Sequence, residues 1–127
     1  MSERKYKKLF ARYRPIWKAF ENIGWNVRRY DNTVELENYS PADEDLVEML
    51  YLDEKENIVR QLYDIYDNFD EEEHIAMWLE AKQSGKQGIP CVWTLVKDAE
   101  EITEMYKQLF CLAQENYELC KGDKLNV

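Results

Sequence analysis

The sequence predicts an α+β fold, in which a three-stranded antiparallel β-meander packs against four to five helices. Two patterns in the 127-residue chain lead to this prediction. Apolar residues recur every three or four positions before residue 24 and after residue 57, as one face of a helix requires. Between these segments the period shortens to two, which is typical of strands. Because the strands form one block instead of alternating with helices, an antiparallel sheet covered on one face is favoured.

The N-terminal helical pattern covers residues 6–23 and is interrupted by Pro15. A proline inside a helix removes a backbone hydrogen bond, whereas a proline in the first turn costs little. The segment is therefore predicted either as one kinked helix or, more simply, as two consecutive helices that end at Gly24. We treat residues 1–127 as a single domain, with residues 1–15 as an N-terminal helical extension.

Three strands are predicted between residues 25 and 52. The first two flank Asp31-Asn32, a hairpin signature, with Val34 and Leu36 directed into the core. Residues 44–52 continue the alternation with apolar side chains on both faces, so this strand is predicted to lie centrally in the sheet. A helix is the competing interpretation for residues 44–52, because Leu, Met and Glu favour helices.

Three further helices are predicted after the sheet. The first covers residues 58–69, and the second begins where Asp70 and Glu73 form a capping-box pattern. A loop is expected at residues 85–91, and a long final helix is expected to end near Lys121-Gly122. The second of these helices is predicted to direct four apolar side chains inward, namely Ile75, Trp78, Leu79 and Ala81.

Charge is sorted along the chain. The formal net charge is −9, but residues 1–30 carry +7 and residues 42–80 carry −12. Blocks of this kind either pair within the fold or present faces of opposite sign to partners. An acidic face can occupy a basic groove on another protein, although such faces often serve only solubility. The predicted protein-binding patch is acidic and consists of Asp67, Asp70, Glu71, Glu72 and Glu73. The alternative, a basic nucleic-acid or nucleotide site, consists of Arg4, Lys5, Lys8, Arg12, Arg28 and Arg29.

No recognisable motif predicts catalysis, and we expect no catalytic residue, metal or cofactor. His74 is the one histidine, and packing beside Trp78, four residues later, is favoured over a role as general base or metal ligand. Cys91, Cys111 and Cys120 form no C-x-x-C pair and are predicted to be small buried apolar side chains, without disulfides, in a reducing cytosol. No apolar run approaches the roughly 18–20 residues that a membrane span needs. The many aromatic residues make a homodimer a further expectation.

Short motifs spread over about three-quarters of the chain lead to one resemblance. They are Gly24-Trp25-x-Val27, Val34-Glu35-Leu36, Asn38-Tyr39-Ser40-Pro41-Ala42, Glu44-Asp45, Phe69-Asp70, Glu73-His74, Met77-Trp78, Glu80-Ala81, Gly88-Ile89-Pro90 and Leu95-Val96-x-Asp98-Ala99. With these motifs, residues 16–113 resemble a group of small uncharacterised proteins encoded by phages and mobile elements of gut bacteria. The resemblance implies no site residue, and it implies the cytoplasm of a host bacterial cell. By analogy of context it suggests an anti-defence role.

The function expected from the sequence is therefore that of a non-enzymatic, acidic protein-binding module of phage or mobile-element origin. Its expected partner is a protein with a basic surface, in the most specific case a host nucleic-acid-processing defence enzyme. Binding of nucleic acid or a nucleotide by the basic N-terminal helix is the alternative, and activity centred on His74 is the least favoured possibility.

Overall fold

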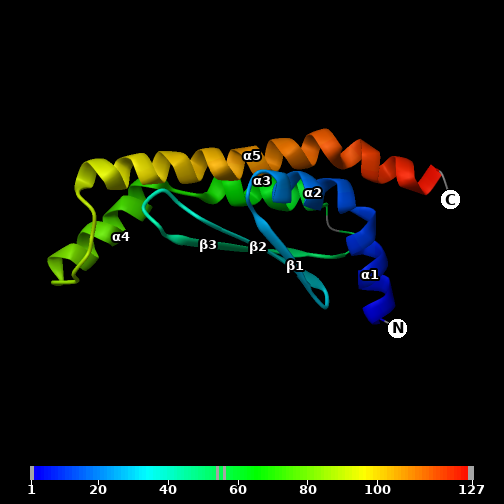
Figure 1. Cartoon of the computed structure of the whole chain (residues 1–127), viewed down its shortest axis with the longest axis horizontal. Coiled ribbons are helices and arrows are strands. Elements are labelled where there is room, and N and C mark those ends of the chain that lie inside the picture. Colours follow the sequence, from blue (N-terminus) through cyan, green and yellow to red (C-terminus); the bar gives the residue numbers. More distant parts are fainter. Residues whose placement is uncertain (1, 54, 56, 126–127) are drawn as a thin grey trace.

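A computed structural model describes residues 2–53, 55 and 57–125 and confirms the α+β prediction (Figure 1). Five helices and a three-stranded antiparallel sheet occur in these ranges. Their order is α1 (Ser2–Arg12), α2 (Arg14–Asn22), β1 (Asn26–Tyr30), β2 (Thr33–Tyr39), β3 (Asp45–Tyr51), α3 (Ile58–Asn68), α4 (Glu71–Gln83) and α5 (Val92–Leu125). No helix among the described residues is both long and apolar enough to cross a bilayer.

Two separate helices form the N-terminal segment, which is the second of the two predicted arrangements. Pro15 lies in the first turn of α2, where its missing N–H leaves no helical hydrogen bond unmade. Gly24 follows the end of α2 with a φ of 102°, a left-handed conformation that glycine adopts without steric cost. The chain then turns directly into β1.

The sheet is a meander in the order β1-β2-β3, so β2 is the central strand. Arg28 lies opposite Glu35 across the first hairpin, and Val34 and Leu36 are fully buried, as predicted. The central position predicted for the third strand is wrong, because β3 pairs with β2 alone and forms an edge. Its second apolar face (Val47, Met49 and Tyr51) is 40–54% exposed, so the apolar pattern on both faces did not signal burial on both faces. The helical alternative for this segment is also wrong.

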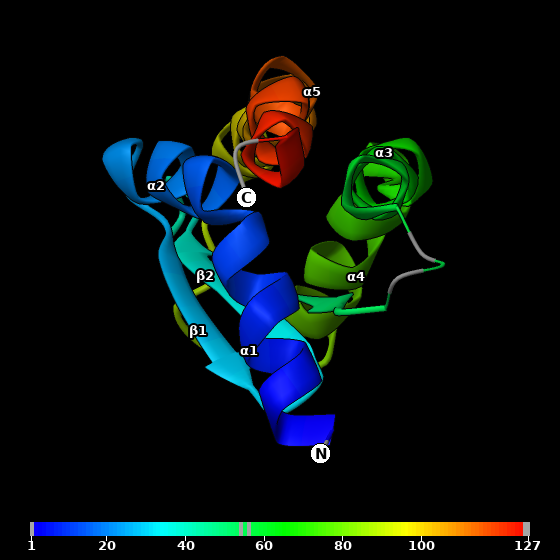
Figure 2. The same ribbon diagram turned by 90° about the vertical axis from the view of Figure 1, so that its right-hand side faces the viewer.

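All the helices lie on one side of the sheet or beyond its ends (Figure 2). The helix α5 extends along the long axis of the molecule and packs against α2, α3 and α4 (Figure 1). The centre of the core contains Phe20 of α2, Leu36 of β2, Leu62 of α3 and Ile102 of α5, each at most 1% exposed. The apolar faces of the helices thus pack against the inner face of the sheet and form one apolar layer with it.

The three later helices form at the predicted places, with two corrections. None of the residues of α4 is fully buried, so the four side chains predicted to point inward are only half-buried. The helix lies at one end of the molecule, beyond the sheet, where less apolar surface is available to cover it (Figure 1). The final helix does not end near Lys121-Gly122 but continues to Leu125. A single glycine costs a helix only about 1 kcal/mol and need not end it. None of the three cysteines forms a disulfide, but the prediction that all three are buried holds for Cys120 alone, since Cys111 is half-buried and Cys91 is exposed just before α5.

Replacement of Leu36 by alanine tests the position of the core. Leu36 is fully buried on the central strand, so Leu36→Ala is expected to lower the free energy of unfolding by about 2–5 kcal/mol. Met49→Ala on the outer face of β3 should cost about 0.5 kcal/mol or less, since Met49 is 40% exposed. Urea denaturation of both variants measures the difference, and equal losses would contradict this assignment of the two faces.

Candidate functional site

The predicted acidic patch lies at the junction of α3 and α4 and is concave. Four of its members, Asp67, Asp70, Glu71 and Glu72, line a depression of about 600 Å³ together with Tyr66, Asn68, Phe69 and Thr103. We call this depression the α3–α4 concavity. The fifth member, Glu73, is exposed in the first turn of α4. Residues chosen from the sequence by charge alone therefore surround one depression with two aromatic rings in its wall.

Two carboxylates of the patch also have structural roles. The side chain of Asp70 is the N-cap of α4 and accepts a hydrogen bond from the Glu73 amide at 3.1 Å. The Glu71 carboxylate accepts a hydrogen bond from the Thr103 hydroxyl of α5, which fixes the start of α4 against the long helix. Asp67 and Glu72 are exposed and hold two negative charges at the rim of the concavity.

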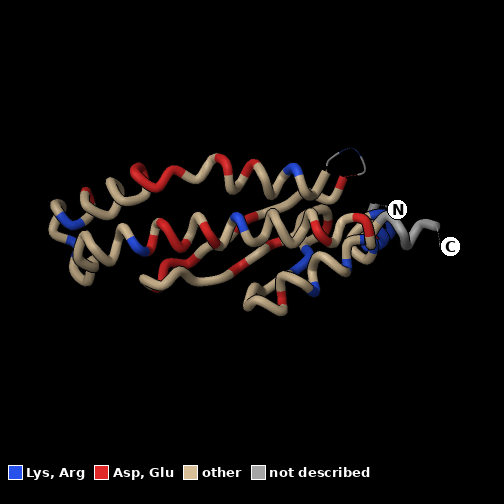
Figure 3. The backbone as a smooth tube through the Cα atoms, turned by 90° about the horizontal axis from the view of Figure 1, so that it is seen from above, with Lys and Arg blue, Asp and Glu red and all other residues tan. Residues whose placement is uncertain are grey.

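The predicted basic site draws on α1 and β1, which an ion pair between Arg29 and Glu3 joins. Arg29 forms an ion pair with Glu3 at 2.6 Å and donates to the Asp31 carbonyl, so the fold itself uses this charge. Arg28 lies opposite Glu35 on the neighbouring strand. The remaining members belong to α1, where helical spacing places them along one stripe: Arg4, Lys5, Lys8 and Arg12. The basic end and the acidic helices are apart along the molecule (Figure 3).

A second cluster, formed by Glu44, His74 and Asp98, joins three distant parts of the chain. Glu44 lies at the end of the β2–β3 loop, which Ser40 closes by accepting a hydrogen bond from the Glu44 amide at 3.1 Å. The Ser40 amide donates to the Glu44 carbonyl at 2.9 Å, and Asp43 between them has a φ of 66°. His74 projects from α4 and Asp98 from the first part of α5.

The three side chains meet at the Nε2 atom of His74. This atom lies 2.9 Å from Glu44 Oε2 and 3.5 Å from Asp98 Oδ2. The Asp98 side chain is 0% exposed and that of His74 is 11% exposed. The other oxygen of Asp98, Oδ1, accepts a hydrogen bond from the Ala42 amide at 2.7 Å. Asp98 therefore holds the β2–β3 loop against α5 with one oxygen and faces His74 with the other.

Burial shapes the electrostatics of this cluster. Removal from water raises the pKa of Glu44, because desolvation disfavours the carboxylate. His74 opposes this pKa shift, Asp98 adds to it by repulsion, and the indole N–H of Trp78 again lowers the pKa. Trp78 Nε1 lies 3.3 Å from His74 Nε2, and the Phe69 ring packs on the other side of the imidazole, with centroids 5.3 Å apart. Two carboxylates thus share one imidazole in a largely enclosed setting.

The cluster opens onto a cavity of about 370 Å³, which Glu44, His74 and Trp78 line together with Met77, Ala81 and Lys86. One imidazole and two carboxylates can exchange protons or bind a cation. The sequence correctly placed His74 beside Trp78 but missed Glu44 and Asp98, which are far away in the chain. The sequence feature that could have linked these residues was the resemblance, because its motifs include Glu44, Asp98, His74 and Trp78.

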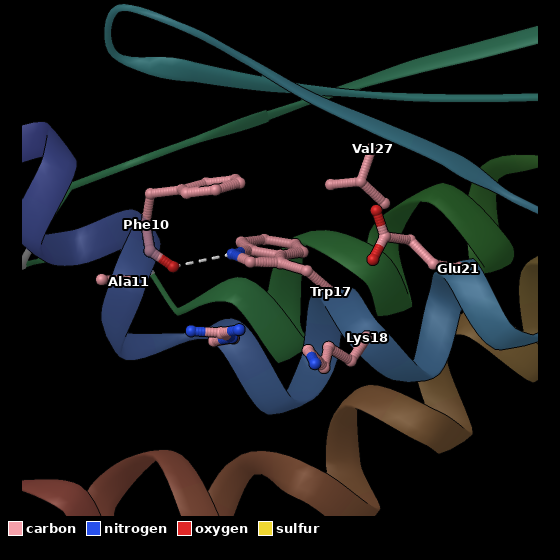
Figure 4. Close-up of a pocket in the computed structure, with 7 residues that line it drawn as sticks. Phe10, Ala11, Trp17, Lys18, Glu21 and Val27 are labelled. Atoms are coloured by element: carbon pink, nitrogen blue, oxygen red, sulfur yellow. Dashed lines mark hydrogen bonds between the residues drawn. The ribbon is translucent and has the colours of Figure 1, made fainter.

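A third cavity, of about 330 Å³, lies between the two N-terminal helices and β1 (Figure 4). Its wall contains Phe10 and Trp17, stacked with centroids 5.5 Å apart, and Val27. The indole N–H of Trp17 donates to the Phe10 carbonyl at 2.8 Å. The rings and Val27 make the cavity surface mainly apolar, and charged side chains line it as well: Arg14, Lys18 and Glu21.

Comparison with protein-family models, with curated proteins and with solved structures finds no match for this chain. The arrangement of the side chains is therefore the basis for the functional argument below.

Two substitutions at Asp70 test its capping role. Asp70→Ala removes both the charge and the acceptor for the Glu73 amide, and we expect a loss of about 0.5–2 kcal/mol in the free energy of unfolding. Asp70→Asn removes the same charge but keeps a capping oxygen, so its loss should be clearly smaller. Thermal or urea unfolding compares the two. Equal destabilisation would show that charge, not capping, makes the contribution.

Proposed function

We propose that this domain is a protein-binding module, not an enzyme, and that the α3–α4 concavity receives a basic segment of its partner. The observation that supports this function best is the gathering of Asp67, Asp70, Glu71 and Glu72 around one depression of about 600 Å³. Acidic groups scattered over a surface would serve solubility alone, whereas groups around a depression can surround a guanidinium or ammonium group.

The aromatic rings in the same wall strengthen the proposal. Tyr66 and Phe69 offer apolar surface and ring faces to the carbon chain and cationic head of an arginine or lysine. Phe69 is in turn packed edge-on against Tyr106, with centroids 5.6 Å apart, so its orientation is fixed in advance. A wall ordered before binding reduces the entropy that association must overcome.

Charge separation along the molecule favours an oriented encounter. The acidic helices lie away from the basic α1 end, so a basic partner is attracted to one region and repelled from the other (Figure 3). In its most specific form, we propose that this basic segment belongs to a nucleic-acid-processing defence enzyme of the bacterial host. The phage or mobile-element origin, the cytoplasmic location and the homodimer expected from the sequence stay predictions.

A pair of double variants tests the concavity. Asp67→Asn with Glu72→Gln removes two charges at its rim, and Glu21→Gln with Glu115→Gln removes two exposed charges elsewhere. With an oligo-arginine peptide as probe, we expect the rim variant to bind about fivefold to tenfold more weakly, since each surface charge pair contributes roughly 0.2–1 kcal/mol. The control variant should bind like the unchanged chain. Isothermal titration at low and high salt measures both affinities; a similar loss for the two variants would refute the concavity as the binding site.

The exposed basic stripe of α1 favours one alternative, binding of nucleic acid. If it is correct, the chain should bind single-stranded DNA at low salt. Replacing Arg4, Lys5, Lys8 and Arg12 by glutamine should then abolish binding, because phosphate contacts account for most non-specific affinity. Fluorescence anisotropy with a labelled oligonucleotide measures the DNA affinity of the unchanged chain and of this variant. Absence of DNA binding by the unchanged chain at low salt would eliminate the alternative.

A further inference from the structure

We propose that Glu44, His74 and Asp98 form a binding site for a divalent transition-metal ion of the Zn²⁺ class. The proposal is independent of the α3–α4 concavity and rests on different residues. One nitrogen and two oxygens, one from each side chain, lie within 4.8 Å of one another. Each belongs to a residue type that commonly binds such ions.

The distances around His74 fit an ion. Bonds to zinc from imidazole nitrogen and carboxylate oxygen are about 2.0–2.2 Å long. With such bonds, the separations of 2.9 Å and 3.5 Å between His74 Nε2 and the two carboxylate oxygens correspond to angles of about 90° and about 110° at the metal. These angles are normal for coordinated zinc. The two carboxylate oxygens lie within 4.8 Å of each other, so at most a small adjustment of these side chains brings all three donors onto one ion.

The strongest observation concerns Asp98. Its side chain is 0% exposed, yet its Oδ2 atom accepts no hydrogen bond from any described residue. Glu44 Oε2 is likewise buried, and its close polar contact is His74 Nε2 at 2.9 Å. An unpartnered buried carboxylate oxygen costs free energy, and two of them beside one imidazole repel each other as well. A divalent cation between them would satisfy both oxygens and neutralise both charges.

The surroundings hold the three donors in place, as a second coordination shell does. The Ala42 amide fixes Asp98 through Oδ1 and leaves Oδ2 directed toward His74. The Ser40 hydroxyl fixes the Glu44 backbone, and the rings of Phe69 and Trp78 flank the imidazole. These contacts place the three donors, and the long hydrogen bond of 3.3 Å from Trp78 Nε1 to His74 Nε2 is the contact that an ion bound at Nε2 would replace.

The donors also indicate the kind of ion and what else it binds. An imidazole nitrogen favours zinc, copper, iron or nickel over magnesium and calcium, which prefer sites made only of oxygen. Three protein ligands leave at least one position open, and the adjoining cavity of about 370 Å³ supplies room for water or an anionic group there. Lys86 in the wall of that cavity would favour an anion at the open position.

Zinc binding by the whole chain tests the proposal directly. Because thiolates also bind zinc, the measurements use a background with the exposed Cys91 replaced by serine. Isothermal titration of metal-free protein should show one zinc ion per chain, and the melting temperature should rise with zinc. Calcium at the same concentration should produce neither effect.

Three near-isosteric variants and one control locate the ion. We expect Glu44→Gln, His74→Gln and Asp98→Asn each to weaken zinc binding by more than about tenfold, the range over which even outer-shell changes act. Glu80→Gln, an exposed carboxylate of the same helix as His74, should bind zinc like the background protein. Failure of the background protein to bind zinc would overturn the proposal, as would unchanged affinity in the three site variants.

Stability without metal separates ligation from a purely structural role. Asp98→Asn keeps the acceptor for the Ala42 amide and removes a buried charge, so in the presence of a chelator this variant should melt at or above the temperature of the background protein. If all three variants melt well below the background protein in chelator, the cluster is a structural hydrogen-bond network and the metal proposal fails.

Discussion

Burial of the inner face of the sheet beneath α5 is the constraint on which the rest of the structure depends. The strands place Val34, Leu36 and Leu50 on one face, and this face leaves water when the helices cover it: α2 contacts β1, α3 contacts β3, and α5 packs on both helices. The same helix provides the surface against which α2, α3 and α4 pack. Every side chain that α5 directs toward the sheet or toward α4 is thereby fixed in position, including the few polar ones. Both candidate sites include some of these polar residues, namely Asp98 and Thr103.

Three polar residues of α5 make contacts to other elements along its length. Asp98 holds the β2–β3 loop through the Ala42 amide, Thr103 bonds Glu71 at the start of α4, and Tyr106 donates to the Glu48 carboxylate of β3 at 2.7 Å. Burial, with the Glu48 carboxylate as a second cause, raises the pKa of Tyr106 and keeps its donor in place. The rings of Phe69 and Tyr106 then connect the α3–α4 concavity to the imidazole of His74. The two candidate sites are therefore neighbours that share one wall.

Much of this fold could be predicted because turn and cap residues act on their neighbours in the sequence. The rest depends on which distant segments pair, and the sequence does not show this directly. Pro15, Gly24, the Asp31-Asn32 turn and the Asp70 cap each act within a few residues, so the sequence located the elements that they delimit. The edge position of β3 depends instead on which strands pair, and its exposed apolar face resembled that of a buried strand. The acidic patch was found because charge can be read directly, but the partners of His74 were not. Glu44 and Asp98 lie next to His74 only in the folded chain, because the three residues belong to the β2–β3 loop, α5 and α4, respectively.

The fold brings Glu44, His74 and Asp98 together, and we propose that they surround a single metal position. The most direct measurement is a crystal structure of the zinc-soaked protein with anomalous diffraction data on both sides of the zinc absorption edge. If zinc binds to the three side chains, one anomalous peak is expected within about 2.2 Å of His74 Nε2 and of one oxygen each from Glu44 and Asp98. An empty cluster with zinc bound elsewhere, or with Glu44 and Asp98 turned away from His74, would contradict it.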